Sequence, residues 1–174
     1  SEAIGLALPN SAGAPAPYES RDEYAEASGS AVVNLIKNGG PYPRDIVTQK
    51  SLENAAAIVA ATGGSTNAAL HLPAIAHEAG IDFNLFHVAE IFKKTPYIAN
   101  LRPGGKYVAK DLYDVGGVGV VIKELLDHGY IHGDCITVTG KTIAENYADV
   151  VLPKNQDVVF PISNPIYSTG GVVG

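Results

Sequence analysis

The 174-residue chain contains no methionine, and its only cysteine is Cys135. With one cysteine the chain cannot form an internal disulfide, and it cannot by itself supply a site that needs several thiolates. No apolar run approaches the roughly 20 residues that a membrane-spanning helix requires, and residues 1–20 lack a basic and apolar signal pattern. We therefore expect a protein of the cytoplasm, or of an organelle if the source is a eukaryote, without a membrane partner.

Positive charge is also scarce. The 12 Lys and Arg residues are outnumbered by 18 Asp and Glu residues, which gives a formal net charge of -6. This balance argues against an electrostatic grip on nucleic acid, so we expect no nucleic-acid partner. A hydrophobic content of 46% with 17% charged residues is typical of a folded chain and not of a disordered one.

The missing methionine also bears on the ends of the chain. Residues 1–5 have the composition of the middle of a helix, and residues 170–174 end without a helix or a polar tail. From these two features we expect the sequence to be an internal segment of a longer protein.

Helical periodicity is clearest between residues 21 and 37. Ser20-Arg21-Asp22-Glu23 matches the capping-box pattern that begins a helix, and the glycines at 39 and 40 with Pro41 are expected to end it. The apolar residues of this segment recur at helical spacing and predict a stripe that faces the core: Tyr24, Ala27, Ala31, Val32, Leu35 and Ile36.

The rest of the chain predicts more helices separated by short extended segments. An alanine-rich helix is expected to begin at Thr48, and capping, glycine and periodicity signals predict others at 68–79, 87–94, 107–113, 120–128 and from Thr142. Extended segments are predicted at 96–101, 136–138 and 157–162, with a short strand or turn at 43–47. This alternation predicts an α/β fold, rich in helix, with short and mainly parallel strands.

Residues 63–67, Gly-Gly-Ser-Thr-Asn, separate two alanine-rich segments and predict the end of one helix and the start of the next. Either glycine can adopt the left-handed conformation that ends a helix, and Ser65 or Thr66 can cap the helix that follows. The first-turn N–H groups would favour an anion, and His71 lies one turn further on. The substrate-pocket candidates are therefore Ser65, Thr66, Asn67 and His71. The alternative is an ordinary connector between packed helices.

Other patterns fail on inspection. Thr139-Gly140-Lys141-Thr142 resembles the end of a phosphate-binding P-loop, but Cys135 occupies the position of the first glycine. His77-Glu78 begins like a zinc-protease helix, yet residue 81 is Ile and not the second histidine. The five histidines are scattered, and we assign no metal ligand and no catalytic residue in this chain.

Several segments together carry a family resemblance. They are Pro43-Arg44-Asp45-Ile46, Gly63-Gly64-Ser65-Thr66-Asn67 with His71-Leu72, Ala76-His77-Glu78-Ala79-Gly80, and residues 132–142 with Glu145-Asn146. In order and spacing they resemble the dihydroxy-acid dehydratase and phosphogluconate dehydratase family across the whole chain. Residues 102–107, Arg-Pro-Gly-Gly-Lys-Tyr, look closest to the dihydroxy-acid dehydratases of branched-chain amino-acid synthesis.

The resemblance implies a hydro-lyase that converts a small 2,3-dihydroxy acid to a 2-keto acid, with an iron-sulfur cluster and Mg²⁺ in the complete enzyme, which is expected to be a homo-oligomer. The family's cluster cysteines, modified lysine, magnesium carboxylates and serine base lie in motifs that this chain does not contain, so no cofactor is expected on it. We expect the chain alone to be inactive. A sugar-acid dehydratase and a noncatalytic scaffold are the alternatives.

The resemblance also implies part of a larger two-domain enzyme. Residues 1–149 are expected to form the later part of the N-terminal dehydratase domain. Residues 150–174 are expected to form a linker and the start of a truncated C-terminal domain.

Overall fold

The computed structural model describes residues 1–172, and the last two residues of the predicted C-terminal segment, 173 and 174, lie outside the described residues. The helices of the described part are α1 (Ser20–Asn38), α2 (Pro43–Ile46), α3 (Gln49–Thr62), α4 (Ala68–Ala79), α5 (Leu85–Lys94), α6 (Ala109–Asp114), α7 (Val118–Asp127) and α8 (Ile143–Asn146). Among the described residues, no helix is long and apolar enough to cross a membrane.

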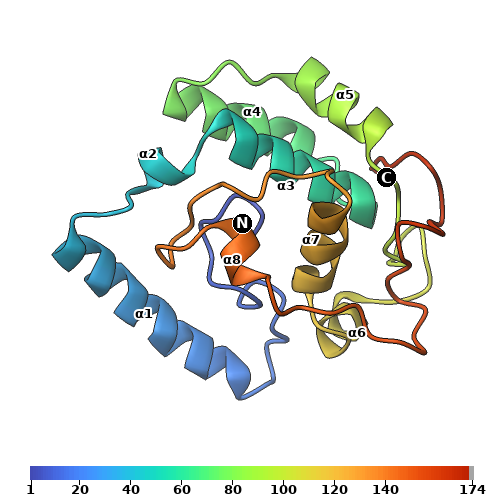
Figure 1. Ribbon diagram of the computed structural model, residues 1–174, viewed down its shortest axis with the longest axis horizontal. Helices are drawn as coiled ribbons and strands as arrows, with labels where there is room; N and C mark the ends of the chain where they lie inside the picture. Colours follow the sequence, from blue (N-terminus) through green and yellow to red (C-terminus); the bar gives the residue numbers. More distant parts are fainter. Residues whose placement is uncertain (173–174) are drawn as a thin grey trace.

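Helix α3 lies at the centre of the packing, in contact with α4, α5 and α7 (Figure 1). The Thr48 side chain caps its first turn by accepting the N–H of Ser51, as the sequence predicted for the start of this helix. Four alanines of α3 are completely buried, namely Ala56, Ala57, Ala60 and Ala61. Because these side chains are small, neighbouring segments can approach the α3 backbone closely.

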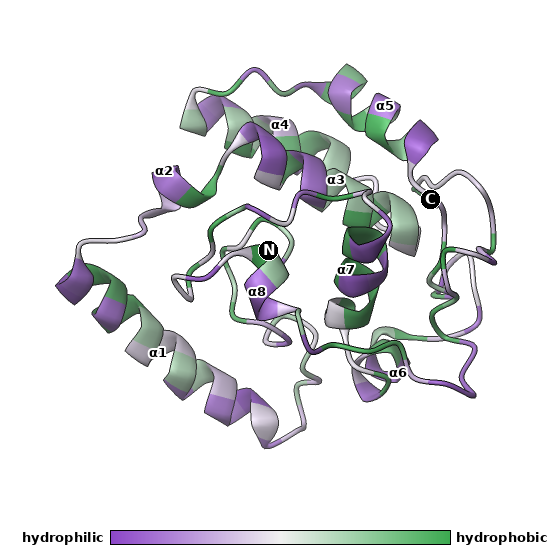
Figure 2. Ribbon diagram, viewed as in Figure 1, coloured by the Kyte–Doolittle hydropathy of each residue, from purple (hydrophilic) through white to green (hydrophobic). Residues whose placement is uncertain are grey.

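The buried residues form two clusters on either side of α3. The larger includes Val120, Val121, Ile122 and Leu125 of α7, and the smaller joins α3 to α4, α5 and the N-terminal segment. Apolar residues, green in Figure 2, accordingly gather along α3, α4 and α7 in the interior. The N-terminal segment at residues 3–4 is buried in the smaller cluster.

The prediction of a helix-rich chain is confirmed, but the predicted strands are not found between residues 1 and 172. The structure has only isolated bridges there, three antiparallel and one parallel. Residues 97–99 are all buried, so this extended segment lies within the core. Residues 43–46 form a single helical turn, with Pro43 in its first turn, where a missing N–H costs nothing.

Helix α1 corrects a second prediction. Its bounds agree with the sequence, but the apolar stripe that was assigned to the core is not buried. No residue of α1 is buried, and Ile36 is 70% exposed. The Ser20 capping box is also wrong, because the helix begins at Ser20 after Glu19, without a side-chain cap. Periodicity fixes the direction of a helix face, whereas burial needs a partner, and α1 lies along one edge of the molecule (Figure 1).

The segment after residue 156 packs against the segment after α5. Phe160 N–H donates to the Ile98 carbonyl at 2.8 Å, and Tyr97 N–H donates to the Tyr167 carbonyl at 3.0 Å. Val158 and Val159 are buried in the larger cluster. This part of the predicted C-terminal segment is therefore joined to the same core as the rest of the chain.

Candidate functional site

The connection at residues 63–67 leads from α3 into α4. Gly63 ends α3 in the left-handed conformation, with φ of 60°, as the sequence predicted for one of the two glycines. Its Cα lies against the ring of Tyr97, which is 6% exposed. Gly63 is thus required both by its backbone angle and by this close approach.

The start of α4 differs from the predicted capped helix. Asn67 occupies the N-cap position without a side-chain cap. The N–H groups of Ala68, Ala69 and Leu70 donate instead to the carbonyls of the three preceding residues, at 3.0 to 3.1 Å. Ser65 Oγ accepts the Asn67 N–H at 3.2 Å. Because these first-turn N–H groups already have acceptors, fewer of them can bind an anion than the sequence predicted.

Within residues 1–172, the N–H groups of Ser65 and Thr66 have no acceptor. Both residues are exposed. The donors available to a ligand therefore belong to the turn before α4 and not to the helix itself.

Three of the four predicted pocket residues line one cavity of about 570 Å³. Ser65, Asn67 and His71 face it from the start of α4, and Val118 from the start of α7. The other walls come from α3 and the N-terminal segment: Ala55, Ile58, Val59, Ser1, Glu2, Ala3, Ile4, Ala12 and Gly13, with Ala68, Leu72 and Ile75 of α4. Its volume is within the range typical of small-molecule sites.

The fourth predicted residue, Thr66, lies on a separate hollow of about 470 Å³, which Ser65 also lines. The hollow is also lined by Thr62, Gly63 and Gly64 and by Leu101, Arg102 and Pro103. The charged residue Arg102 was not among the predicted pocket residues. The sequence marked Arg102 only as the first residue of the loop at 102–105. The fold is what places that loop beside Thr66.

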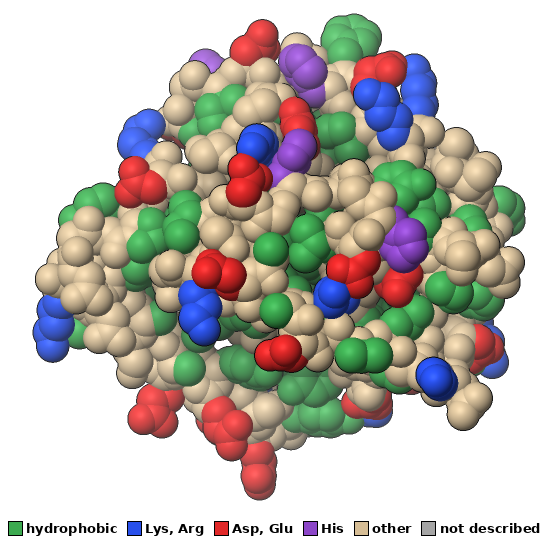
Figure 3. All heavy atoms as spheres, in the orientation of Figure 1, with side chains coloured by type: hydrophobic (Ala, Val, Ile, Leu, Met, Phe, Trp, Pro, Cys, Tyr) green, Lys and Arg blue, Asp and Glu red, His purple; other side chains and the backbone are tan. Residues whose placement is uncertain are grey.

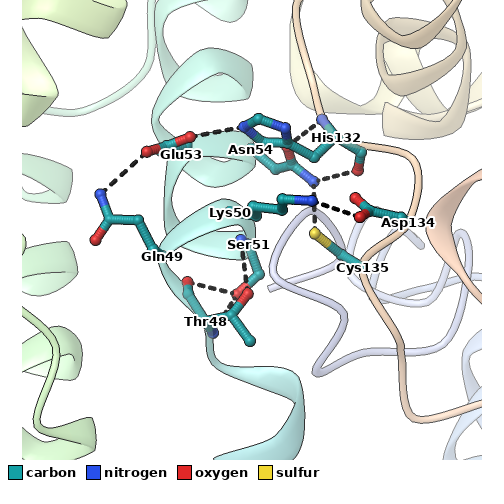
Figure 4. A network of polar contacts seen from close by, with 9 residues as sticks. All are labelled: Thr48, Gln49, Lys50, Ser51, Glu53, Asn54, His132, Asp134 and Cys135. Atoms are coloured by element: carbon teal, nitrogen blue, oxygen red, sulfur yellow. Dashed lines mark hydrogen bonds and ion pairs between the residues drawn. The ribbon is translucent and has the colours of Figure 1, made fainter.

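A polar network joins α3 to the segment before α8 (Figure 4). The amide of Asn54, which is completely buried, accepts the His132 N–H at 2.7 Å and donates to the His132 carbonyl at 2.8 Å. Glu53 Oε2 lies 2.6 Å from His132 Nε2, and Lys50 Nζ lies 2.5 Å from Asp134. The network holds the 132–135 segment, one of those that carry the resemblance, against α3. No pattern in the sequence predicted a contact of Asn54.

The hydrogen bond to Lys50 lowers the pKa of Asp134 and, in turn, raises that of Lys50. Both groups are well exposed to water. Exposed pairs of this kind contribute little to stability, so the buried amide of Asn54 is the stronger connection in the network.

Cys135 is buried at the inner end of this network, with its Sγ 3.6 Å from Asn54 Nδ2. Burial raises the pKa of the thiol. A neutral, inaccessible thiol reacts slowly. We expect Cys135 to resist labelling by a disulfide reagent at pH 8 at least about 100-fold relative to the urea-unfolded chain. Stopped-flow absorbance with and without urea measures this ratio; equal rates would contradict the burial.

The residues described here do not fit the metal centres that the family resemblance implies. Among residues 1–172, no three His, Cys, Asp or Glu side chains are grouped so that they could hold a metal ion. The buried thiol of Cys135 is turned toward Asn54.

On the face shown in Figure 3, basic side chains are scattered among acidic ones and form no continuous patch.

Comparison with known proteins agrees with the family resemblance found in the sequence. Residues 1–146 match the family model described as dihydroxy-acid/6-phosphogluconate dehydratase N-terminal. The chain is 71% identical over its whole length to a dihydroxy-acid dehydratase of Parvibaculum lavamentivorans, and 67% identical to dihydroxy-acid dehydratase 2 of Bradyrhizobium diazoefficiens. It is 66% identical over 99% of its length to dihydroxy-acid dehydratase 2 of Mesorhizobium japonicum. The chain spans 29 to 30% of the length of these relatives.

Proposed function

Because the chain belongs to the dihydroxy-acid/6-phosphogluconate dehydratase family, we propose that it is part of a dihydroxy-acid dehydratase, a hydro-lyase of branched-chain amino-acid biosynthesis. The observation that carries this proposal is the 71% identity over all 174 residues to a protein named dihydroxy-acid dehydratase. The motif at residues 102–107 supports the same assignment over a sugar-acid dehydratase.

The proposed reaction removes water from a 2,3-dihydroxy carboxylic acid. The C2–H bond breaks as a proton leaves, the C3–O bond breaks as hydroxide leaves, and the two form water. The resulting enol loses its O–H proton and takes a proton at C3, which gives the 2-keto acid, so no oxidant or reductant is consumed. The part that we propose for this chain in the reaction is to bind and orient the acid.

The substrate site that we propose lies in the cavity at the start of α4. Ser65, Asn67 and His71 supply hydroxyl, amide and imidazole groups on one wall, and the N–H group of Ser65 is an available donor. A dihydroxy acid presents a carboxylate and two hydroxyls, which such groups can bind. The apolar residues of α3 suit the carbon chain of the substrate.

The other parts of the proposal concern the whole enzyme. An iron-sulfur cluster supplies Lewis-acid chemistry and Mg²⁺ holds the substrate in this family, and we propose that both are bound by residues outside this chain. A homo-oligomer, a cytoplasmic location and activity only in the larger two-domain enzyme stay predictions. We also propose a domain boundary near residue 150, and the end of the N-terminal family match at residue 146 supports it.

The function is tested with the full-length protein, purified without oxygen and supplied with iron, sulfide and Mg²⁺. We expect 2-keto acid to form from a branched 2,3-dihydroxy acid, measured by hydrazone absorbance, at least about 100-fold faster in kcat/KM than from an aldonic acid. A preference for the aldonic acid would point to a sugar-acid dehydratase. No product from either acid would favour the noncatalytic scaffold.

Ser65→Ala and Asn67→Ala test the proposed substrate contacts. Each removes one hydrogen-bonding group from the cavity wall, and a bond to a charged ligand contributes about 1.5 to 3 kcal/mol. We expect kcat/KM to fall by about 10-fold or more, measured by initial rates. Ser30→Ala, on the exposed face of α1, is the matched control and should leave the rate unchanged.

Thr66→Val distinguishes the two hollows. If the acid occupies only the larger cavity, this substitution should change kcat/KM less than about 3-fold, because Thr66 lines the other hollow. Normal rates in both Ser65→Ala and Asn67→Ala would leave residues 63–67 as an ordinary connector.

A further inference from the structure

We propose that Glu2 is a positioning residue that fixes the loop at residues 8–13 as a wall of the α4 cavity and so sets the affinity for the substrate. The anchoring of the loop stands on geometry alone. Only its consequence for affinity rests on the proposed function.

Glu2 is 3% exposed, and both oxygens of its carboxylate accept hydrogen bonds. Oε2 accepts the Asn10 N–H at 2.8 Å and the Tyr147 hydroxyl at 3.1 Å. Oε1 accepts the Ala12 N–H at 3.0 Å. Glu2 therefore ties the loop to the core next to α8, although Tyr147 is 145 residues away in the sequence.

This arrangement explains why a carboxylate is buried here. Burying an ionised group is unfavourable unless it is well hydrogen-bonded, and burial accordingly raises the pKa of Glu2 while the bonds from Asn10 and Ala12 oppose that rise. An apolar side chain could fill the same space, but it could not accept the two loop N–H groups. The specific contribution of Glu2 is thus to hold the loop in one position.

The loop position matters for the cavity. Ala12 and Gly13 line it together with Glu2. Asn10 has a left-handed backbone, with φ of 66°, and its amide oxygen is buried without a partner among residues 1–172. That oxygen lies so near the first turn of α7 that a Cβ on Gly117 would be 3.0 Å from it. A displaced loop would therefore change the shape of the cavity and its contact with α7.

Glu2→Gln tests the proposal in the full-length enzyme. Glutamine keeps the size, but it has one acceptor oxygen and a donor group that faces a loop N–H or the Tyr147 hydroxyl. We expect amide hydrogen exchange in peptides covering residues 8–14 to become about 10-fold faster. We also expect KM for the dihydroxy acid to rise about 10-fold while kcat changes less than about 2-fold.

The matched control is Glu145→Gln. The Glu145 carboxylate also accepts a backbone N–H, that of Thr142 at 2.7 Å. It does not line the cavity, and it accepts no hydrogen bond from the loop at residues 8–13. This control should leave loop exchange and KM unchanged even if it lowers the melting temperature. If Glu2→Gln does not fold, Glu2→Asp, which is one methylene too short to reach both N–H groups, should show the same two changes.

The outcomes separate the two proposals. Unchanged exchange at residues 8–14 in the Glu2 variant would overturn the anchoring role, whatever the activity. Faster exchange with an unchanged KM would overturn the link to substrate affinity. A wild-type enzyme without any dehydratase activity would refute the proposed function together with that link, while the exchange measurement would still decide whether Glu2 anchors the loop.

Discussion

Replacing Asn54 by leucine should lower the free energy of unfolding by about 2 to 6 kcal/mol. The Asn54 amide satisfies both the N–H and the carbonyl of His132, at 2.7 and 2.8 Å. Leucine fills a similar space but leaves both backbone groups without a partner, and each unsatisfied buried group costs about 1 to 3 kcal/mol. The large effect follows because Asn54 is completely buried, so water cannot take over its role without a structural change.

Asn54→Asp should be at least as destabilising as leucine. It keeps an acceptor for the His132 N–H, but it places a carboxylate oxygen against the His132 carbonyl, in a site with no exposure. An unpaired buried charge is among the most destabilising changes that a core can receive. Chemical denaturation, followed by circular dichroism at several urea concentrations, gives the free energies of all variants.

The controls for Asn54 are the same two substitutions at Asn34. This residue is on the exposed surface of α1, and changes there should stay within about 0.5 kcal/mol of the wild type. Faster labelling of Cys135 in the Asn54 variants would report local opening at the same place, since Asn54 Nδ2 lies 3.6 Å from its sulfur. A loss below about 1 kcal/mol for Asn54→Leu would show that the His132 backbone finds other partners.

Gly63→Ala should be the second large effect, at about 2 to 5 kcal/mol. Two costs add: alanine is strained at φ of 60° by about 1 to 2 kcal/mol, and the new Cβ would be 2.7 Å from Cε2 of Tyr97. The Tyr97 ring cannot yield easily, because it is buried and stacks on Tyr167. Overpacking of this kind costs typically about 1 to 3 kcal/mol.

Gly80→Ala separates the two costs. Gly80 ends α4 in the same left-handed conformation, with φ of 74°, but a Cβ there would meet nothing within 4 Å. It should therefore lose only the backbone cost of about 1 to 2 kcal/mol, again measured by urea denaturation. Equal losses for the two variants would show that Tyr97 moves aside at little cost. A larger loss at Gly80 would contradict the packing described for Gly63.

Local chemistry in the sequence determined the helices well. Thr48, Gly63, Gly80 and Thr142 mark helix ends where the sequence placed them, because capping bonds and left-handed glycines depend on residues within one turn. The family was also accessible from the sequence, since its motifs are contiguous segments.

Tertiary structure alone decided burial and long-range contacts. The stripe of α1 is regular in the sequence, yet none of its residues is buried, and residues 97–101 are extended without forming a ladder, because each outcome depends on what packs alongside. The clamp of Asn54 on His132 spans 78 residues, and the bond from Tyr147 to Glu2 spans 145. Such contacts leave no periodic pattern, so the cavity that Glu2 shares with Ser65, Asn67 and His71 becomes visible only when the chain is folded.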